Sequence, residues 1–109
     1  MNDLIKKPGY GTDFYYYIPI SETEGVHVNV TDTREVFLHG AKKYKDFGFE
    51  AGNVMISNHF YACLRHLWRW FINNNLDKET KQSHLHHAHC RLLMMMYQEQ
   101  QGLNDDRLR

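Results

Sequence analysis

Histidine is concentrated in one stretch of this sequence, from Ser57 to Tyr97, which holds six of the chain's eight histidines. An imidazole can donate or accept a proton near neutral pH, hydrogen-bond a phosphate or ligate a metal ion. His84 and His87 are one helical turn apart, and His66 belongs to the helix-like segment before them. We therefore predict that these three histidines are catalytic residues of one site. The alternative for each is a structural histidine, hydrogen-bonded to the backbone or to an acidic side chain.

Basic and aromatic side chains near this stretch could hold a nucleotide. An arginine guanidinium can bind a phosphate through two hydrogen bonds, and a lysine acts as a point charge. The predicted phosphate-binding residues are Lys42, Lys43, Arg65 and Arg91. The alternative is a solvated surface or, for Arg65, an ion pair with Asp77 or Glu79. Phe49 is a candidate for stacking on a purine base, whereas a place in the core is the better interpretation of Trp68.

Acidic and cysteine side chains offer two kinds of metal site. Mg²⁺ or Mn²⁺ takes carboxylate oxygens, and the predicted ligands are the nearby acids Glu50, Asp77 and Glu79. A second pattern, Cys63-x-x-His66 and His87-x-x-Cys90, occurs in mirrored order on two helices, and such ligands suit tetrahedral zinc. Cysteine within a helix is more often a small buried apolar residue, and acids in loops are usually just exposed to solvent. Magnesium, zinc and no metal therefore all stay open.

Two helices are needed to position these side chains. Apolar positions recur at steps of four, three and four in both halves of the stretch, as they do along one face of a helix. They are Phe60, Leu64, Leu67 and Phe71, then Leu85, His89, Leu92 and Met96. We expect these faces to form the core, with the histidine stripes beside them meeting along one seam. Ser57 suits the N-cap of the first helix, and Gly102 suits the end of the second.

The earlier residues predict a third helix and an extended segment. Asp32 with Glu35 forms a capping box, so the predicted helices cover 32–45, 57–74 and 81–101. Residues 14–30 are rich in aromatic and β-branched side chains, which favours a β-hairpin or extended arms, and Pro19 favours an edge position for the first strand. The predicted fold is mainly α, a small helical bundle of about three main helices with an N-terminal extended or β-hairpin segment.

The length of the chain is that of one small domain, and its charge does not indicate a nucleic acid or a membrane as its partner. A chain of 109 residues can bury about two thirds of its unfolded surface. We divide it into an arm or hairpin at 1–31, a helical core at 32–101 and a tail at 102–109, whose charged residues 104–109 we expect to fray. Thirteen basic and thirteen acidic residues balance, which argues against DNA, RNA or a membrane surface as partner. No apolar run reaches the roughly 18 residues of a membrane span, so we expect a cytoplasmic protein whose two cysteines stay thiols.

The first of the two histidine-bearing helices is apolar on nearly every side. A helix that is hydrophobic all round is buried on more than one side, and a domain this small has few elements of its own to cover it. We therefore predict a homo-oligomer that forms through this helix and through the aromatic segment at Tyr15–Tyr17.

Three short motifs follow one another in a recognisable order. They are Gly40-Ala41-Lys42-Lys43-Tyr44, Leu64-Arg65-His66-Leu67-Trp68 and His84-Leu85-x-His87-Ala88-x-Cys90, with Asp77 and Glu79 before the last. In this order they resemble the phage and bacterial family described as dATP/dGTP diphosphohydrolase, N-terminal domain. That family is loosely related to the all-α, MazG-like nucleotide pyrophosphohydrolases. The resemblance covers roughly residues 40–97.

The resemblance implies a purine nucleotide as the ligand. It implies hydrolysis of purine (deoxy)nucleoside triphosphates to the monophosphate and pyrophosphate, with Mg²⁺ or Mn²⁺ as cofactor, in the host cytoplasm if a phage encodes the protein. The E-x-x-E and E-x-x-D pairs of MazG-like enzymes do not occur in this sequence. An alternative is therefore a non-catalytic protein that sequesters a phosphate-bearing signalling nucleotide, as an anti-defence sponge would. A purely structural role is the third possibility.

Overall fold

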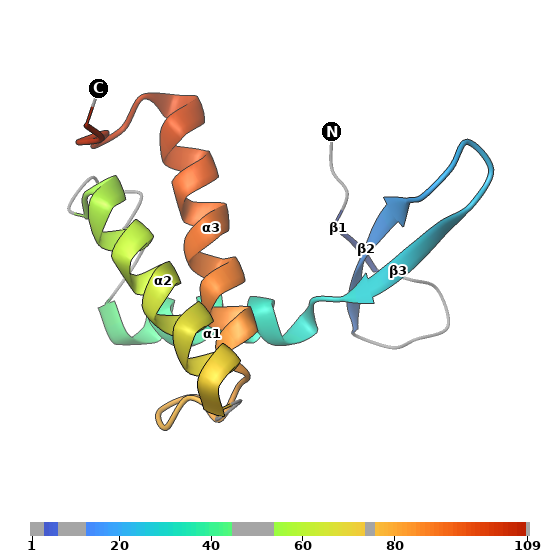
Figure 1. Ribbon diagram of the computed structural model, residues 1–109, viewed down its shortest axis with the longest axis horizontal. Helices are drawn as coiled ribbons and strands as arrows, with labels where there is room; N and C mark the ends of the chain where they lie inside the picture. Colours follow the sequence, from blue (N-terminus) through green and yellow to red (C-terminus); the bar gives the residue numbers. More distant parts are fainter. Residues whose placement is uncertain (1–3, 7–12, 45–53, 74–75, 109) are drawn as a thin grey trace.

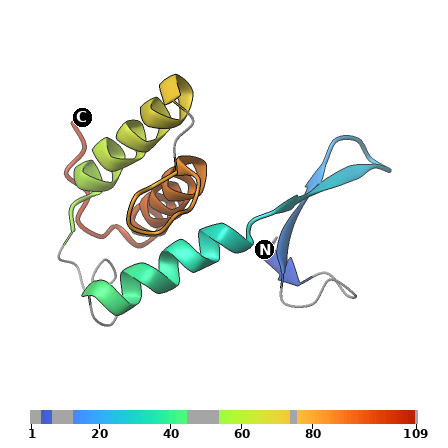
Figure 2. The ribbon, with the colours of Figure 1, turned by 90° about the horizontal axis from the view of Figure 1, so that it is seen from below.

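Three helices and a small antiparallel sheet make up the described part of the protein (Figure 1). The computed structural model describes residues 4–6, 13–44, 54–73 and 76–108. The helices are α1 (Thr31–Tyr44), α2 (Ile56–Asn73) and α3 (His84–Gln101). Helix α3 packs against both α2 and α1 and lies between them when seen end-on (Figure 2). The prediction of a mainly α fold with three main helices is confirmed.

The ends of α3 are fixed by residues on either side of it. The Ser83 hydroxyl accepts a hydrogen bond from the Leu85 amide at 3.2 Å, so the helix begins at His84 rather than at residue 81. Gly102 adopts the left-handed conformation with φ of 64°, and its N–H donates to Gln98 and Glu99 carbonyls. A residue with a Cβ is strained in this conformation, which is why glycine suits the position. The predicted stop at Gly102 is confirmed.

The start of α2 depends on the C-terminal tail. The helix begins at Ile56, whose amide donates to the Asn104 carbonyl at 3.0 Å. Ser57 is therefore inside the first turn and is not the N-cap that we predicted. Its amide and hydroxyl donate to the Asp106 carboxylate at 3.0 and 2.5 Å, and a carboxylate is favourable at this end of a helix. The tail is thus docked over residues 104–106, and the expectation that it frays is wrong there.

The sheet has three strands in the order β1-β2-β3, namely β1 (Leu4–Lys6), β2 (Phe14–Pro19) and β3 (Gly25–Asn29). The predicted β2–β3 hairpin is confirmed, while β1 was not predicted. Pro19 does not put β2 at an edge. It lies at the end of β2 and pairs with Gly25, beyond the three residues that pair with β1, so its missing N–H interrupts no pairing with β1. The predicted capping box also differs, because α1 begins at Thr31 and Asp32 lies in its first turn.

The sheet extends away from the three helices (Figures 1 and 2). Its base is joined to the helical part by a hydrogen bond from the Phe14 amide to the Thr31 hydroxyl at 2.8 Å. The Tyr16 ring lies edge-on to the ring of His89, with centroids 5.6 Å apart. No helix among the described residues is long and apolar enough to span a membrane.

The core between the helices contains mainly small side chains. Its buried apolar residues are Val30, Val36, Ile56, Ala62, Cys63, Ala88 and Cys90. The large apolar side chains of α2, which we expected in the core, are exposed; Trp68 is 61% and Phe71 73% exposed. The face of α2 that meets α3 carries His59 and Cys63 instead, both buried. Small side chains let the two helices approach closely, and the histidine stripe itself becomes the interhelical seam.

Candidate functional site

Histidines from α2 and α3 meet along this seam. The Nδ1 atoms of His66 and His84 are 2.8 Å apart and share a hydrogen bond. The His66 ring stacks on the ring of His87, with centroids 4.6 Å apart and planes 18° from parallel. His84 is almost fully buried, with 4% of its surface exposed, whereas the other two rings are partly accessible. The structure thus brings together the three histidines that we predicted as catalytic; the catalytic role itself stays a prediction.

A carboxylate reaches the histidines from the loop between α2 and α3. Asp77 Oδ2 accepts hydrogen bonds from the amides of Glu79 and Thr80, at 3.1 and 3.0 Å, and from the Thr80 hydroxyl at 3.2 Å. The same hydroxyl lies 2.6 Å from Nε2 of His87, and Asp77 Oδ2 is 3.6 Å from that nitrogen. Aspartate favours such turns because its side chain can bond the backbone two residues on. The turn fixes the position of the carboxylate beside His87.

Burial keeps the imidazoles of His66 and His87 neutral at pH 7 by lowering their pKa values. Burial, followed by the nearby His87 and His84, lowers the pKa of His66 to about 4. Burial also lowers the pKa of His87, although the charge of Asp77 opposes this shift. Burial would raise the pKa of Asp77, but hydrogen bonds from Thr80 and the neighbouring His87 outweigh it and lower the value. The site therefore presents neutral ring nitrogens next to an ionised carboxylate.

Arg91 adds a positive charge to the same seam. Its Nη1 atom lies 3.0 Å from Nδ1 of His59, a ring that is 1% exposed. Burial and then this guanidinium lower the pKa of His59 to about 4. The charge of Arg91 also lowers the pKa values of His66 and His87, which shows that all three rings lie within its field. A fixed cation beside neutral imidazoles favours an anion.

The other predicted binding residues either have no observed contact with the seam or lie outside the described residues. Arg65 is exposed on α2, directly before His66. Lys42 and Lys43 lie in the last part of α1, but their side chains are outside the described part of the chain, as are Phe49 and Glu50 entirely. The Glu79 carboxylate bonds the His39 ring at 2.9 Å, which joins the loop after α2 to α1.

Of the predicted carboxylate ligands, Asp77 alone joins a group of potential metal ligands among the described residues. That group is His66, Asp77 and His87, each offering one ligand atom, with these atoms within 4.8 Å of one another. Glu79 bonds His39 instead of joining this group, and Glu50 lies outside the described residues. The magnesium site that the resemblance implies therefore stays a prediction.

The cysteines of the zinc pattern stay outside this group. Both are buried free thiols, and the Cys63 thiol donates to the Ala88 carbonyl at 3.5 Å. Burial raises the pKa of both thiols, that of Cys90 to about 12, whereas a metal ligand must be a thiolate. Their place in the helix seam is that of small apolar residues, as the alternative interpretation had it.

Two features of the seams were missed from the sequence. Thr80 joins Asp77 to His87, and the order of an aspartate with a threonine three residues later is a recognisable turn signal. On the opposite side of α3, the Thr33 hydroxyl contacts Nδ1 of His86 at 2.8 Å and Nδ1 of His89 at 2.9 Å. The histidines of α3 thus form two separate groups, one facing α2 and one facing α1.

Comparison with known proteins places the chain in a family. The family model described as dATP/dGTP diphosphohydrolase, N-terminal, matches residues 27–107. The matched region contains all three helices and both histidine groups, and is longer than the segment on which the resemblance rested. No curated protein and no solved structure matches the chain. The protein belongs to the dATP/dGTP diphosphohydrolase N-terminal family.

Proposed function

We propose that this protein hydrolyses purine (deoxy)nucleoside triphosphates to the monophosphate and pyrophosphate at the seam between α2 and α3. The observation that carries the proposal is the His87–Thr80–Asp77 arrangement beside His66, within the region that the family model matches. Neutral imidazole next to an ionised carboxylate is the arrangement needed for a general base at neutral pH.

In the proposed reaction, water adds to the phosphorus atom of the α-phosphate. The bond between that phosphorus and the bridging oxygen breaks, so pyrophosphate leaves with the bond's electron pair. His87 accepts the proton that the water loses, and Asp77, 3.6 Å from its Nε2 atom, stabilises the imidazolium that results. The Thr80 hydroxyl contacts both side chains and fixes their relative position. The net change is one water consumed and one pyrophosphate released for each nucleotide.

The charge of the seam suits the substrate's phosphates. Arg91 is held against His59 inside the seam, and Arg65 is exposed on α2, directly before His66 in the sequence. We propose that these guanidiniums, with Lys42 and Lys43 from α1, bind the phosphates, since charge-assisted hydrogen bonds are stronger than neutral ones. Phe49 remains the proposed stacking partner of the purine base.

The test is turnover of dATP, dGTP, ATP and GTP, followed by chromatography, in the parent and in two matched variants. His87→Ala removes the proposed base, and His86→Ala removes a neighbouring imidazole that faces Thr33 instead. Loss of a general base costs about 10²–10⁴-fold in rate, so we expect that loss in the first variant and near-parental turnover in the second. Equal rates in the two variants would refute the role of His87. If the parent protein binds nucleotide in calorimetry but shows no turnover with Mg²⁺, Mn²⁺ or Zn²⁺, the protein is a nucleotide binder and not a hydrolase.

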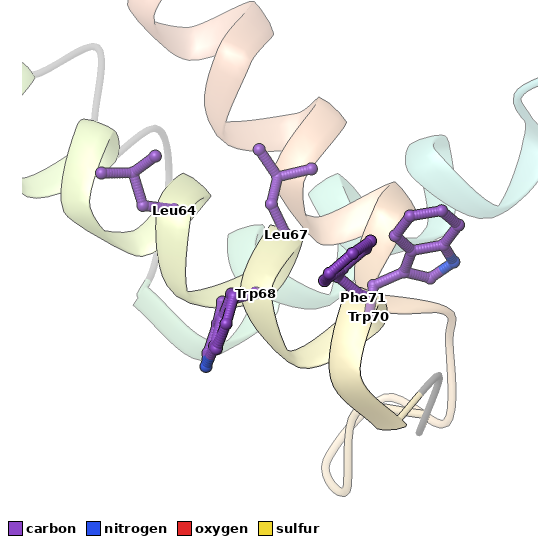
Figure 3. A pocket seen from close by; sticks show the side chains of 5 residues that line it. All are labelled: Leu64, Leu67, Trp68, Trp70 and Phe71. Atoms are coloured by element: carbon purple, nitrogen blue, oxygen red, sulfur yellow. The ribbon is translucent and has the colours of Figure 1, made fainter.

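We also propose that two copies associate through the outer face of α2. Eight large apolar side chains of this helix are exposed, five of which line a shallow apolar pocket (Figure 3). The eight are Phe60, Tyr61, Leu64, Leu67, Trp68, Trp70, Phe71 and Ile72, each between 36% and 73% exposed. At about 150–250 Å² for a large aromatic side chain, the exposed area approaches the roughly 800 Å² per partner of a standard interface. A second copy of a chain with zero net charge meets this face without charge repulsion.

A further inference from the structure

We infer that His66, Asp77 and His87 form a binding site for a divalent transition-metal ion. His84 and Thr80 orient these ligands through hydrogen bonds. The three ligand atoms lie within 4.8 Å of one another. Atoms bound to one ion at about 2.1 Å stand roughly 3.0–3.4 Å apart. The His87–Asp77 pair, at 3.6 Å, is already close to this spacing. The widest spacing in the group must shorten by about 1.4–1.8 Å. Because the rings of His66 and His87 stack 18° from parallel, one of them must also turn so that both ring nitrogens point at the ion.

The chemistry of the ligands selects the class of metal. Magnesium demands an octahedron of oxygen atoms, and this group offers two ring nitrogens for one carboxylate. Imidazole suits zinc, iron, nickel and copper, and two histidines with one carboxylate are a known ligand set for zinc and for non-haem iron. Three protein ligands leave coordination positions open, which distinguishes such a site from a closed structural one.

His84 fixes which nitrogen of His66 can bind the ion. Because the two Nδ1 atoms share one hydrogen bond at 2.8 Å, the nitrogen left for a metal is Nε2 of His66. That requires the proton of His66 to sit on Nδ1 and to be donated to Nδ1 of His84. His84 is buried and cannot easily turn away. Ligating histidines nearly always have such a partner on their second nitrogen.

Thr80 and the turn around it play the same part for Asp77 and His87. The hydroxyl contacts both side chains, at 3.2 and 2.6 Å, and two backbone amides hold the carboxylate. An ion bound at Nε2 of His87 would replace the contact between that nitrogen and Thr80. In the ion-bound form His87 would therefore be a ligand and not the base of the proposed reaction. The charge of Arg91 opposes a cation here, and the ionised Asp77 offsets it. With Arg91 in place, a metal-bound site would carry a net positive charge, which suits an anionic substrate.

The test is metal binding to the nucleotide-free protein, measured with Co²⁺ absorption spectra and with calorimetry of Zn²⁺, Mn²⁺ and Mg²⁺. We expect one transition-metal ion per chain, bound at least tenfold more tightly than Mg²⁺. His66→Ala, Asp77→Asn and His87→Ala should each weaken binding by more than tenfold, and His84→Gln by about 10–100-fold. His86→Ala and His89→Ala are the matched controls, since their rings face Thr33, and should leave the affinity unchanged. Circular dichroism establishes that each variant is folded.

Three results would overturn the inference. They are the absence of stoichiometric Co²⁺ and Zn²⁺ binding in the folded parent, Mg²⁺ binding of equal strength, and transition-metal affinity that folded His66→Ala and His87→Ala variants retain. The assay contains no nucleotide, so its failure leaves the proposed hydrolysis to be judged by turnover alone.

Discussion

Replacing Thr80 by valine should lower both the free energy of unfolding and the rate of nucleotide turnover. Valine has nearly the same shape but no hydroxyl. The substitution removes the contacts of Oγ1 with His87 at 2.6 Å and with Asp77 at 3.2 Å, and it leaves the Gln82 amide, 3.3 Å away, without this acceptor. A single hydrogen bond contributes about 0.5–1.5 kcal/mol, and more when one partner is charged. We expect the free energy of unfolding to fall by about 2 kcal/mol.

The same substitution should lower turnover by about 10–100-fold, the usual effect of removing a group that orients a reacting residue. Thr33→Val is the matched control, because the buried Thr33 hydroxyl also joins two histidines, at 2.8 and 2.9 Å, but on the other side of α3. Urea unfolding and turnover are measured on both variants. The prediction is refuted if the two variants lose similar stability and turnover falls by the same factor in both. It is refuted equally if turnover falls in neither variant.

Three further predictions concern pH, the tail and assembly. Burial lowers the pKa of His59 to about 4, so the unfolded chain binds a proton there that the folded chain does not. The free energy of unfolding should therefore be unaffected by this group above about pH 6.5 and should fall by up to about 3 kcal/mol as the pH falls toward 4. Urea unfolding measures this, and an unchanged urea midpoint between pH 7 and pH 5 contradicts it. Asp106→Asn should lower the melting temperature at pH 7, because this carboxylate accepts two hydrogen bonds at the start of α2. Its lowered pKa means that the parent's advantage disappears as the pH falls, and equal melting curves at pH 7 argue against the cap. Trp68→Glu should convert a dimer to a monomer in sedimentation at tens of micromolar, roughly the range of weak association. The fully exposed Leu108→Glu should not, and a monomeric parent rules out the dimer.

The helices were predictable from the sequence because their apolar periodicity is strong, but the direction in which α2 faces was not. Its apolar residues Phe60, Leu64 and Phe71 share one face, as predicted, and that face is exposed. A helix that is apolar all round leaves open which side meets its own chain. The buried side of α2 carries the small residues Ala62 and Cys63, and the Cys63 thiol lies 3.5 Å from the Ala88 carbonyl of α3.

The site was predictable in part for a similar reason. His66, His84 and His87 were expected to share a seam from their positions on two helices, and they do. Thr80 was missed because its role depends on the turn that Asp77 forms, which helical periodicity does not report. The docking of Asp106 was missed because it joins the tail to the start of α2, 49 residues away in the sequence.

The central claim is that this seam hydrolyses a purine nucleotide, and one measurement tests it most directly. Phosphorus NMR of dGTP incubated with the parent protein, with and without added divalent metal, resolves the products. We expect dGMP and pyrophosphate in equal amounts, without free phosphate, and product formation slower by about 10²-fold or more in the His87→Ala variant. Release of dGDP and phosphate, or intact dGTP after prolonged incubation with every metal tried, would contradict it.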